Sequence, residues 1–147
     1  MKRKTVKTNF DFGSGPVPAH QHINGGGWVA NTATVETSAY VGPTAWVYGD
    51  ARVYGDAQVY GNAQVYGNAR VSGNAWVYGD AQVYGNAWVS GNAQVSCNAR
   101  VSGNAQVYGN AWVYGDAQVY GNAQVYGNAR VSGDCTETAT KNKGGGK

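Results

Sequence analysis

Residues 45–62 read AWVYGDARVYGDAQVYGN, three copies of a six-residue phrase, Ala-x-Val-Tyr/Ser-Gly-Asn/Asp, that recurs along most of the chain. Valine occupies every sixth position from Val29 to Val131, eighteen times without a slip, and alanine stands two residues before each valine from Val35 onward. Ile23 keeps the same phase one step earlier. Self-similarity at a fixed period indicates a stack of units, none of which can bury a core alone. The phrase therefore predicts a repeat architecture.

The period of six predicts β-structure and excludes helix. It is neither a helical period nor a heptad, and a Gly-Asn or Gly-Asp pair in each phrase would interrupt a helix. In an extended chain the Ala and Val of a phrase point to one side, and the residues between and after them point to the other. Glycine takes positive φ freely, and Asn or Asp tolerates left-handed backbone, so the pair supplies a bend. Each phrase is predicted to form one short strand and one corner.

Coiling gives such short strands something to pack against. Three strands and three corners close a triangle, and the next turn of the chain stacks on it at roughly 4.8 Å. The eighteen phrases give about six coils of 18 residues. We therefore predict an all-β fold with one domain, a triangular parallel β-solenoid in which valine and alanine face the interior.

The phrase Val-Tyr-Gly-Asn-Ala-Gln resembles the hexapeptide motif of the left-handed parallel β-helix over about residues 28 to 134. Left-handed coiling is what this resemblance implies, and a right-handed solenoid stays open because parallel crossovers are generally right-handed. The run from His22 to Pro43, HINGGGWV through SAYVGP, and the phrases after it are similar to uncharacterised hexapeptide-repeat proteins of enteric bacteria and their phages. That resemblance implies no particular activity.

The sequence on either side of the repeats is irregular. Residues 1–27 contain two prolines and a glycine triplet and are predicted to form an arm and a segment that covers the first coil, whose backbone edge would otherwise pair with another chain. The repeat itself is assigned to residues 28–134, and residues 135–147 are predicted to form a flexible tail. Cys97 and Cys135 lie about two coils apart, beyond disulfide reach, and fit a reducing compartment.

Charge and hydropathy exclude some classes of partner. The formal net charge is +3, but residues 28–134 hold four Arg against five Asp and one Glu, so the excess positive charge lies outside the repeats. A slightly acidic prism is a poor surface for nucleic acid, which is not an expected partner. The basic start of the chain is followed by no apolar segment, and no stretch approaches the ~20 apolar residues of a membrane span. We expect a cytoplasmic protein, or one carried in a phage particle, with no membrane partner.

His20 and His22 are the only two histidines and form a weak candidate site. Resemblance to hexapeptide-repeat acyltransferases would imply a catalytic histidine near a subunit interface and a loop excursion, and residues 29–134 contain neither. The γ-class carbonic anhydrases place three histidines around zinc, of which a His-x-His pair is only part. We expect surface or capping histidines, with no catalytic residue, cofactor or metal.

Outward positions carry the remaining signal. Residues eighteen apart fall into columns, and identical side chains stacked in register stabilise neighbouring strands. Tyrosine and tryptophan are enriched at interfaces, and large exposed apolar patches are uncommon on monomers. Two aromatic faces are therefore candidate interfaces or ligand surfaces: Trp46, Tyr48, Tyr66 and Tyr84 on one, and Trp76, Tyr78, Trp112 and Tyr114 on the other.

Together these features favour a non-catalytic structural or binding scaffold. We expect it to self-associate through its aromatic faces or its coil ends, as a trimer or an end-to-end stack; side-by-side trimers are what the family resemblance implies. Two alternatives stay open. One is an acyltransferase-like enzyme with a site assembled between subunits from the segment that holds His20 and His22. The other is a carbohydrate-binding surface, in which flat aromatic arrays stack on sugar rings.

Overall fold

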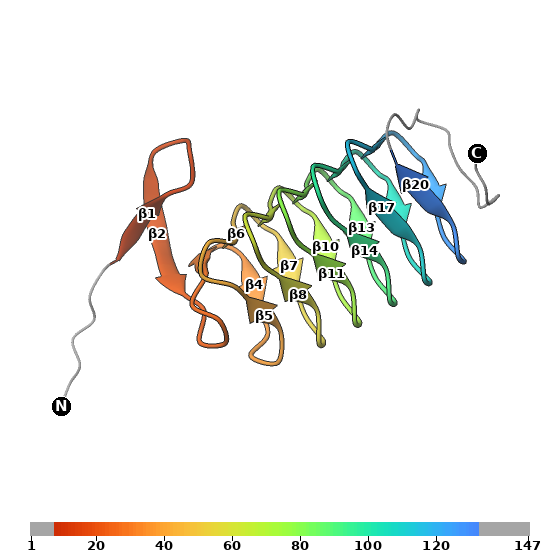
Figure 1. The fold of residues 1–147 in the computed structure, drawn as a ribbon. Helices are drawn as coiled ribbons and strands as arrows, with labels where there is room; N and C mark the ends of the chain where they lie inside the picture. The colour runs from red at the N-terminus through yellow and green to blue at the C-terminus, as the bar shows by residue number, and fades with distance from the viewer. Residues whose placement is uncertain (1–7, 133–147) are drawn as a thin grey trace.

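The computed structural model describes residues 8–132, which form a β-solenoid of about six stacked coils with no helix (Figure 1). Three parallel ladders make the three sides of each coil. The first sheet runs in the order β1 (Asn9–Asp11), β2 (Pro16–Gln21), β3 (Trp28–Ala30), β6 (Trp46–Val47), β9 (Gln64–Val65), β12 (Gln82–Val83), β15 (Arg100–Val101) and β18 (Gln118–Val119). The second consists of β4 (Thr34–Val35), β7 (Arg52–Val53), β10 (Arg70–Val71), β13 (Trp88–Val89), β16 (Gln106–Val107) and β19 (Gln124–Val125). The third consists of β5 (Tyr40–Val41), β8 (Gln58–Val59), β11 (Trp76–Val77), β14 (Gln94–Val95), β17 (Trp112–Tyr114) and β20 (Arg130–Ser132).

The coils stack in perfect register. Each repeat residue pairs with the residue eighteen positions later, as Val47 does with Val65 and Val65 with Val83. Inside the stack, valine and alanine are sealed from solvent: Val83 and Ala81, in the middle of the solenoid, are both 0% exposed. Each buried valine contributes roughly 1.5–3 kcal/mol to stability. Because the core side chains are small, the total stabilisation depends on how many coils are stacked. The predicted fold class and the inward positions are confirmed.

The Gly-Asn and Gly-Asp pairs form the corners. Corner glycines have φ between 64° and 72°, and the glycine of one coil lies directly over that of the next, so a Cβ on Gly85 would come within 2.9 Å of the Gly103 nitrogen. The following Asn or Asp donates its backbone N–H to the carbonyl of the glycine one coil later, as Asn86 does to Gly103 at 2.8 Å. Cys97 is the one non-glycine residue with positive φ, 62°, within residues 8–132.

The N-terminal segment extends the first sheet at one end of the solenoid, while β4 and β5 are the end strands of the other two sheets there. Strands β1 and β2 form an antiparallel hairpin, and β2 also pairs antiparallel with β3 of the first coil, where His20 lies opposite Val29. Figure 1 shows this hairpin at the end of the stack, next to the first coil. The basic positions within residues 1–7, and the tail with Cys135, lie outside the described residues.

One detail of the repeat phase is wrong in the sequence-based prediction. Ile23 is 82% exposed, and the buried residue is its neighbour His22, which is 5% exposed. His22 follows the end of β2, and its ring is held inside by the contact of its Nε2 with the Ala39 carbonyl oxygen at 2.8 Å, whereas Ile23 points to solvent. A turn over residues 22–27 replaces the corner. The His22 N–H donates to the Gly27 carbonyl at 2.7 Å, and the Gly26 N–H donates to the His22 carbonyl at 2.9 Å.

Candidate binding surfaces

The hairpin covers part of the first aromatic face. Phe10 stacks on Trp28 with ring centroids 4.6 Å apart, and Phe12 stacks on Tyr48 at 4.8 Å. Both phenylalanines also contact the edge of Trp46, at 5.4 and 5.6 Å. Phe12 is only 7% exposed. Sequence analysis placed Trp46 and Tyr48 on a candidate interface, and the structure places both against side chains of the same chain.

The tyrosine ladder continues down this face. Tyr48, Tyr66 and Tyr84 stack almost in parallel, with centroids 4.7 and 5.0 Å apart. The Tyr48 hydroxyl donates to the Gln64 side-chain oxygen at 3.1 Å, and the Tyr66 hydroxyl donates to Gln82 in the same way at 3.2 Å. Burial, and secondarily the neighbouring Tyr66, raises the pKa of Tyr48 to about 12. The pKa of Tyr66 is also raised, first by burial and then by Tyr84. The ladder thus ties each coil to the next.

The second aromatic face, on the third sheet, is more open. Trp76 is 36% and Trp112 40% exposed. Each meets the tyrosine two residues later edge-on, Trp76 with Tyr78 at 6.2 Å and Trp112 with Tyr114 at 6.4 Å. The Arg130 guanidinium lies over the Trp112 ring at 4.9 Å. The two tryptophans are two coils apart, with Gln94 of β14 between them in the register.

The two histidines do not form a common site. His20 is exposed, and its Nδ1 lies 2.6 Å from the Asn31 side-chain oxygen. His22 is buried, and its Nε2 lies 2.8 Å from the Ala39 carbonyl oxygen. Within residues 8–132 no group of three or more His, Cys, Asp or Glu side chains is placed to hold a metal ion. In the same range, no helix is long and apolar enough to cross a membrane.

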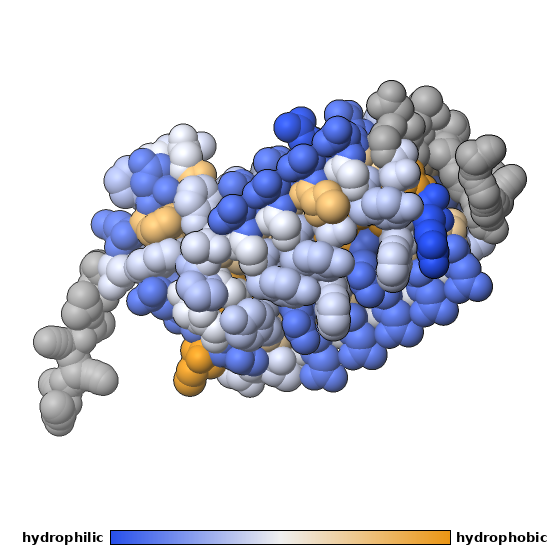
Figure 2. Space-filling view, in the orientation of Figure 1, coloured by the Kyte–Doolittle hydropathy of each residue, from blue (hydrophilic) through white to orange (hydrophobic). Residues whose placement is uncertain are grey.

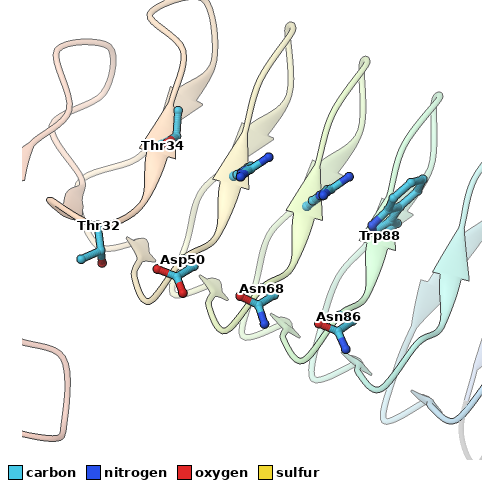
Figure 3. A pocket seen from close by; sticks show the side chains of 8 residues that line it. Thr32, Thr34, Asp50, Asn68, Asn86 and Trp88 are labelled. Carbon is cyan, nitrogen blue, oxygen red and sulfur yellow. The ribbon is translucent and has the colours of Figure 1, made fainter.

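The second sheet carries a polar groove that sequence analysis missed. It has a volume of about 510 Å³ and lies between a row of corner side chains and a row of strand side chains (Figure 3). The corner row comes from the turns that enter β4, β7, β10 and β13, and the strand row from those strands themselves. Arg52 and Arg70 are eighteen residues apart, so a comparison of charged residues at that spacing would have placed them side by side. The groove is lined by Thr32, Thr34, Asp50, Arg52, Asn68, Arg70, Asn86 and Trp88.

Hydrophilic residues dominate the view of the surface in Figure 2. They run in rows along the length of the solenoid, and hydrophobic residues appear between them only as isolated spots. These rows fit the corner positions, where Asn and Asp repeat from coil to coil. Asn74, Asn92 and Asn110 show the contact that repeats there, since each side-chain amide donates to the Asn side chain one coil later at 3.2–3.4 Å.

The far end of the solenoid differs from the capped one. Strands β18, β19 and β20 are the last members of their three sheets, and the described part of the chain supplies no strand beyond them. Their coil is otherwise regular, with Val119 and Val125 0% exposed.

A chain built of in-register coils with asparagine ladders at its corners is a β-solenoid repeat protein. Residues 45–61, 63–79, 81–97, 105–121 and 123–138 match the model of the YdcK β-solenoid repeat, and the chain belongs to that family. Searches of curated proteins and of solved structures found no match.

Proposed function

We propose that the protein is a non-catalytic scaffold that pairs with a second copy of itself through the outer edge of its last coil. The observation that carries the proposal is the difference between the two ends of the first sheet. The β1–β2 hairpin extends this sheet beyond β3, whereas β18 is its last strand within the described residues; the second sheet ends at β4 and β19, and the third at β5 and β20. Unpaired strand edges are ready templates for pairing with another chain.

The hydrogen-bond pattern indicates what this edge offers. In the interior, every second backbone N–H donates to a carbonyl seventeen residues later, as Trp112 does to Ala129 at 3.0 Å and Asn110 to Gly127 at 2.8 Å. For Gln118 and Gln124 the residues seventeen positions later, 135 and 141, lie outside the described part of the chain, and residues 8–132 supply no other acceptor for these two N–H groups. Exposed strand edges pair readily with the edge of another chain, so a second strand edge is a favourable contact.

A second copy fits this edge better than an open stack does. Two identical ends related by a two-fold axis are self-complementary: one strand, such as β18, meets its own copy antiparallel, and the strands of the other two sides meet each other antiparallel, so that donors face acceptors. Head-to-tail growth would have to displace the hairpin, which is held by the Phe10 and Phe12 contacts described above. A closed dimer is therefore the assembly we propose.

A non-catalytic role is supported by the histidines. An acyltransferase-like site needs a histidine directed at a substrate, and His20 and His22 each contact a separate protein acceptor. The hexapeptide resemblance adds left-handed coils and kinship with the hexapeptide-repeat proteins of enteric bacteria and their phages to the proposal. We also propose a place in the cytoplasm or in a phage particle, because Cys97 and Cys135 fit a reducing compartment.

Light scattering coupled to size exclusion, over a range of concentrations, tests the proposal. We expect a species of twice the 15.4 kDa chain mass that dissociates on dilution. Gln118→Pro removes one outward N–H and should shift the equilibrium to monomer, while the matched Gln118→Ala keeps that N–H and should behave as the original protein. A monomer at every concentration would refute pairing. If both variants associate as strongly as the original protein, the interface is not the edge of the last coil, and the aromatic faces become the candidate interface.

A further inference from the structure

The groove on the second sheet places two like charges side by side. Arg52 and Arg70 are register partners on the adjacent strands β7 and β10. Like charges directly opposite one another on neighbouring strands are destabilising. Neither guanidinium forms an ion pair with a carboxylate, by a 4.0 Å limit, within residues 8–132. Glu36, two residues after Thr34 of the groove, accepts a hydrogen bond from the Gly55 N–H at 2.9 Å instead. Within residues 8–132 no ion pair neutralises these two positive charges, although Asp50 lines the same groove.

The corner row beside the arginines is also left open. Elsewhere in the described chain, each corner asparagine with an Asn or Asp one coil later donates its amide to that side chain, as Asn86 does to Asn104 at 3.3 Å and Asn62 to Asp80 at 3.2 Å. No such bond joins Asn68 to Asn86, and the Asp50–Asn68, Asp56–Asn74 and Asp80–Asn98 pairs lack one as well within residues 8–132. The missing Asn68–Asn86 bond falls on the groove, where Figure 3 shows Asp50, Asn68 and Asn86 in a row along the corner. The Asn68 amide, which bonds neither Asp50 nor Asn86, is thus available to a ligand.

An aromatic ring ends the arginine row. Trp88 follows Arg70 in register on β13, and the Arg70 guanidinium lies over its ring at 5.0 Å. Trp88 is nevertheless 43% exposed. The groove thus combines two guanidiniums, an indole, a carboxylate and several amide and hydroxyl groups.

We propose that this groove binds an acidic oligosaccharide, a short glycan that carries carboxylates. Guanidinium groups bind carboxylates with two parallel hydrogen bonds, which suits Arg52 and Arg70. The exposed part of the Trp88 ring offers an apolar surface for the C–H face of a sugar ring. Asp50 accepts hydrogen bonds from sugar hydroxyls and repels a uniformly charged polyanion, and the Thr and Asn side chains complete the hydroxyl contacts. The ligand is therefore acidic at some positions and hydroxylated at the others.

Titration calorimetry of the full chain with tetragalacturonate, and with a neutral galactose tetramer as a comparison, tests this site. We expect heat of binding for the acidic glycan alone, weaker at high ionic strength because the charge pair is exposed to salt. Arg70→Gln should weaken binding about tenfold or more, as the loss of a charge-assisted contact requires. The matched change Arg100→Gln removes the same charge from the first sheet and should leave the affinity unchanged.

A second pair of variants separates recognition from general charge. Trp88→Ala should abolish the measured binding, while Trp76→Ala, on the third sheet, should have no effect. Circular dichroism of each variant, compared with the original protein, checks that the solenoid is intact. No heat with tetragalacturonate would overturn the proposal, as would equal losses from Arg70→Gln and Arg100→Gln, which indicate attraction by net charge. Neither result depends on whether the last coil pairs with a second copy.

Discussion

Cys97 is the position at which one substitution should stabilise the solenoid. It stands where the phrase has glycine, and its φ of 62° lies in the left-handed region. An L-residue pays about 1–2 kcal/mol for that conformation. Glycine costs roughly 0.5–1 kcal/mol more than another residue in conformational entropy on folding, which offsets part of this gain. The Cβ adds a steric cost, because the equivalent contacts at other corners would bring a Cβ to 2.8–3.1 Å from the next glycine's nitrogen. Cys97→Gly should therefore raise the free energy of unfolding by about 1 kcal/mol.

Denaturant unfolding followed by circular dichroism, under reducing conditions, measures this change. An increase of 1 kcal/mol corresponds to a rise in Tm of roughly 2–4 °C for a domain of this size. Cys97→Ala is the matched control: it removes the thiol but keeps a Cβ, so its stability should stay close to that of the original protein. The converse change, Gly85→Cys, should destabilise the protein by at least as much as Cys97→Gly stabilises it. The reasoning is refuted if Cys97→Gly is less stable than the original, or if Cys97→Ala gains as much.

Three further results are expected. Phe12→Ala should lower the free energy of unfolding by about 3 kcal/mol, because Phe12 packs on three aromatic rings. Val17→Ala in the same hairpin, where the side chain is exposed, should change little, and urea unfolding compares the two. Gln64→Ala should cost about 1 kcal/mol by removing the acceptor of the Tyr48 hydroxyl. Gln118→Ala should cost less in the same assay, because its column has Ser102 in place of the donor tyrosine; equal losses would assign the effect to strand packing. Because burial raises the pKa of Tyr48 to about 12 from 10.0, the folded state keeps a proton that the unfolded state releases above pH 10, so stability should fall as pH rises through this window. Tyr48→Phe should show a shallower fall in unfolding experiments between about pH 9 and pH 12, and an unchanged slope would contradict the assignment.

The fold was predictable because the period carries it. A six-residue phrase with alanine and valine two apart predicts a parallel solenoid that buries both on one side and turns at each glycine, without deciding the hand of the coil. The vertical contacts follow from the same period, since residues eighteen apart become neighbours. The stacking of Tyr48 on Tyr66 and of Asn74 on Asn92 is a direct consequence of that spacing.

The ends were less predictable because they break the period. Extending the phase backwards from Val29 placed Ile23 inside, but the hairpin reverses chain direction and buries His22 instead. The same hairpin brings Phe10 and Phe12 onto Trp28, Trp46 and Tyr48, a contact that no periodic pattern implies. The groove was predictable only in part. The sequence places its residues in columns eighteen apart, but it does not show that the Asn68–Asn86 bond is missing or how the arginine side chains are oriented.

The sequence by itself determined which side chains are inside, how many coils there are and which residues stack, because in a solenoid each coil contacts only its neighbours and local rules repeat. The tertiary structure decided how the first coil is closed, which part of the aromatic surface the hairpin covers, and where polar groups remain without partners. Those features depend on contacts between a non-repeating segment and the stack, and on side-chain geometry at single positions. Such contacts are set by three-dimensional packing, which a periodic pattern does not encode.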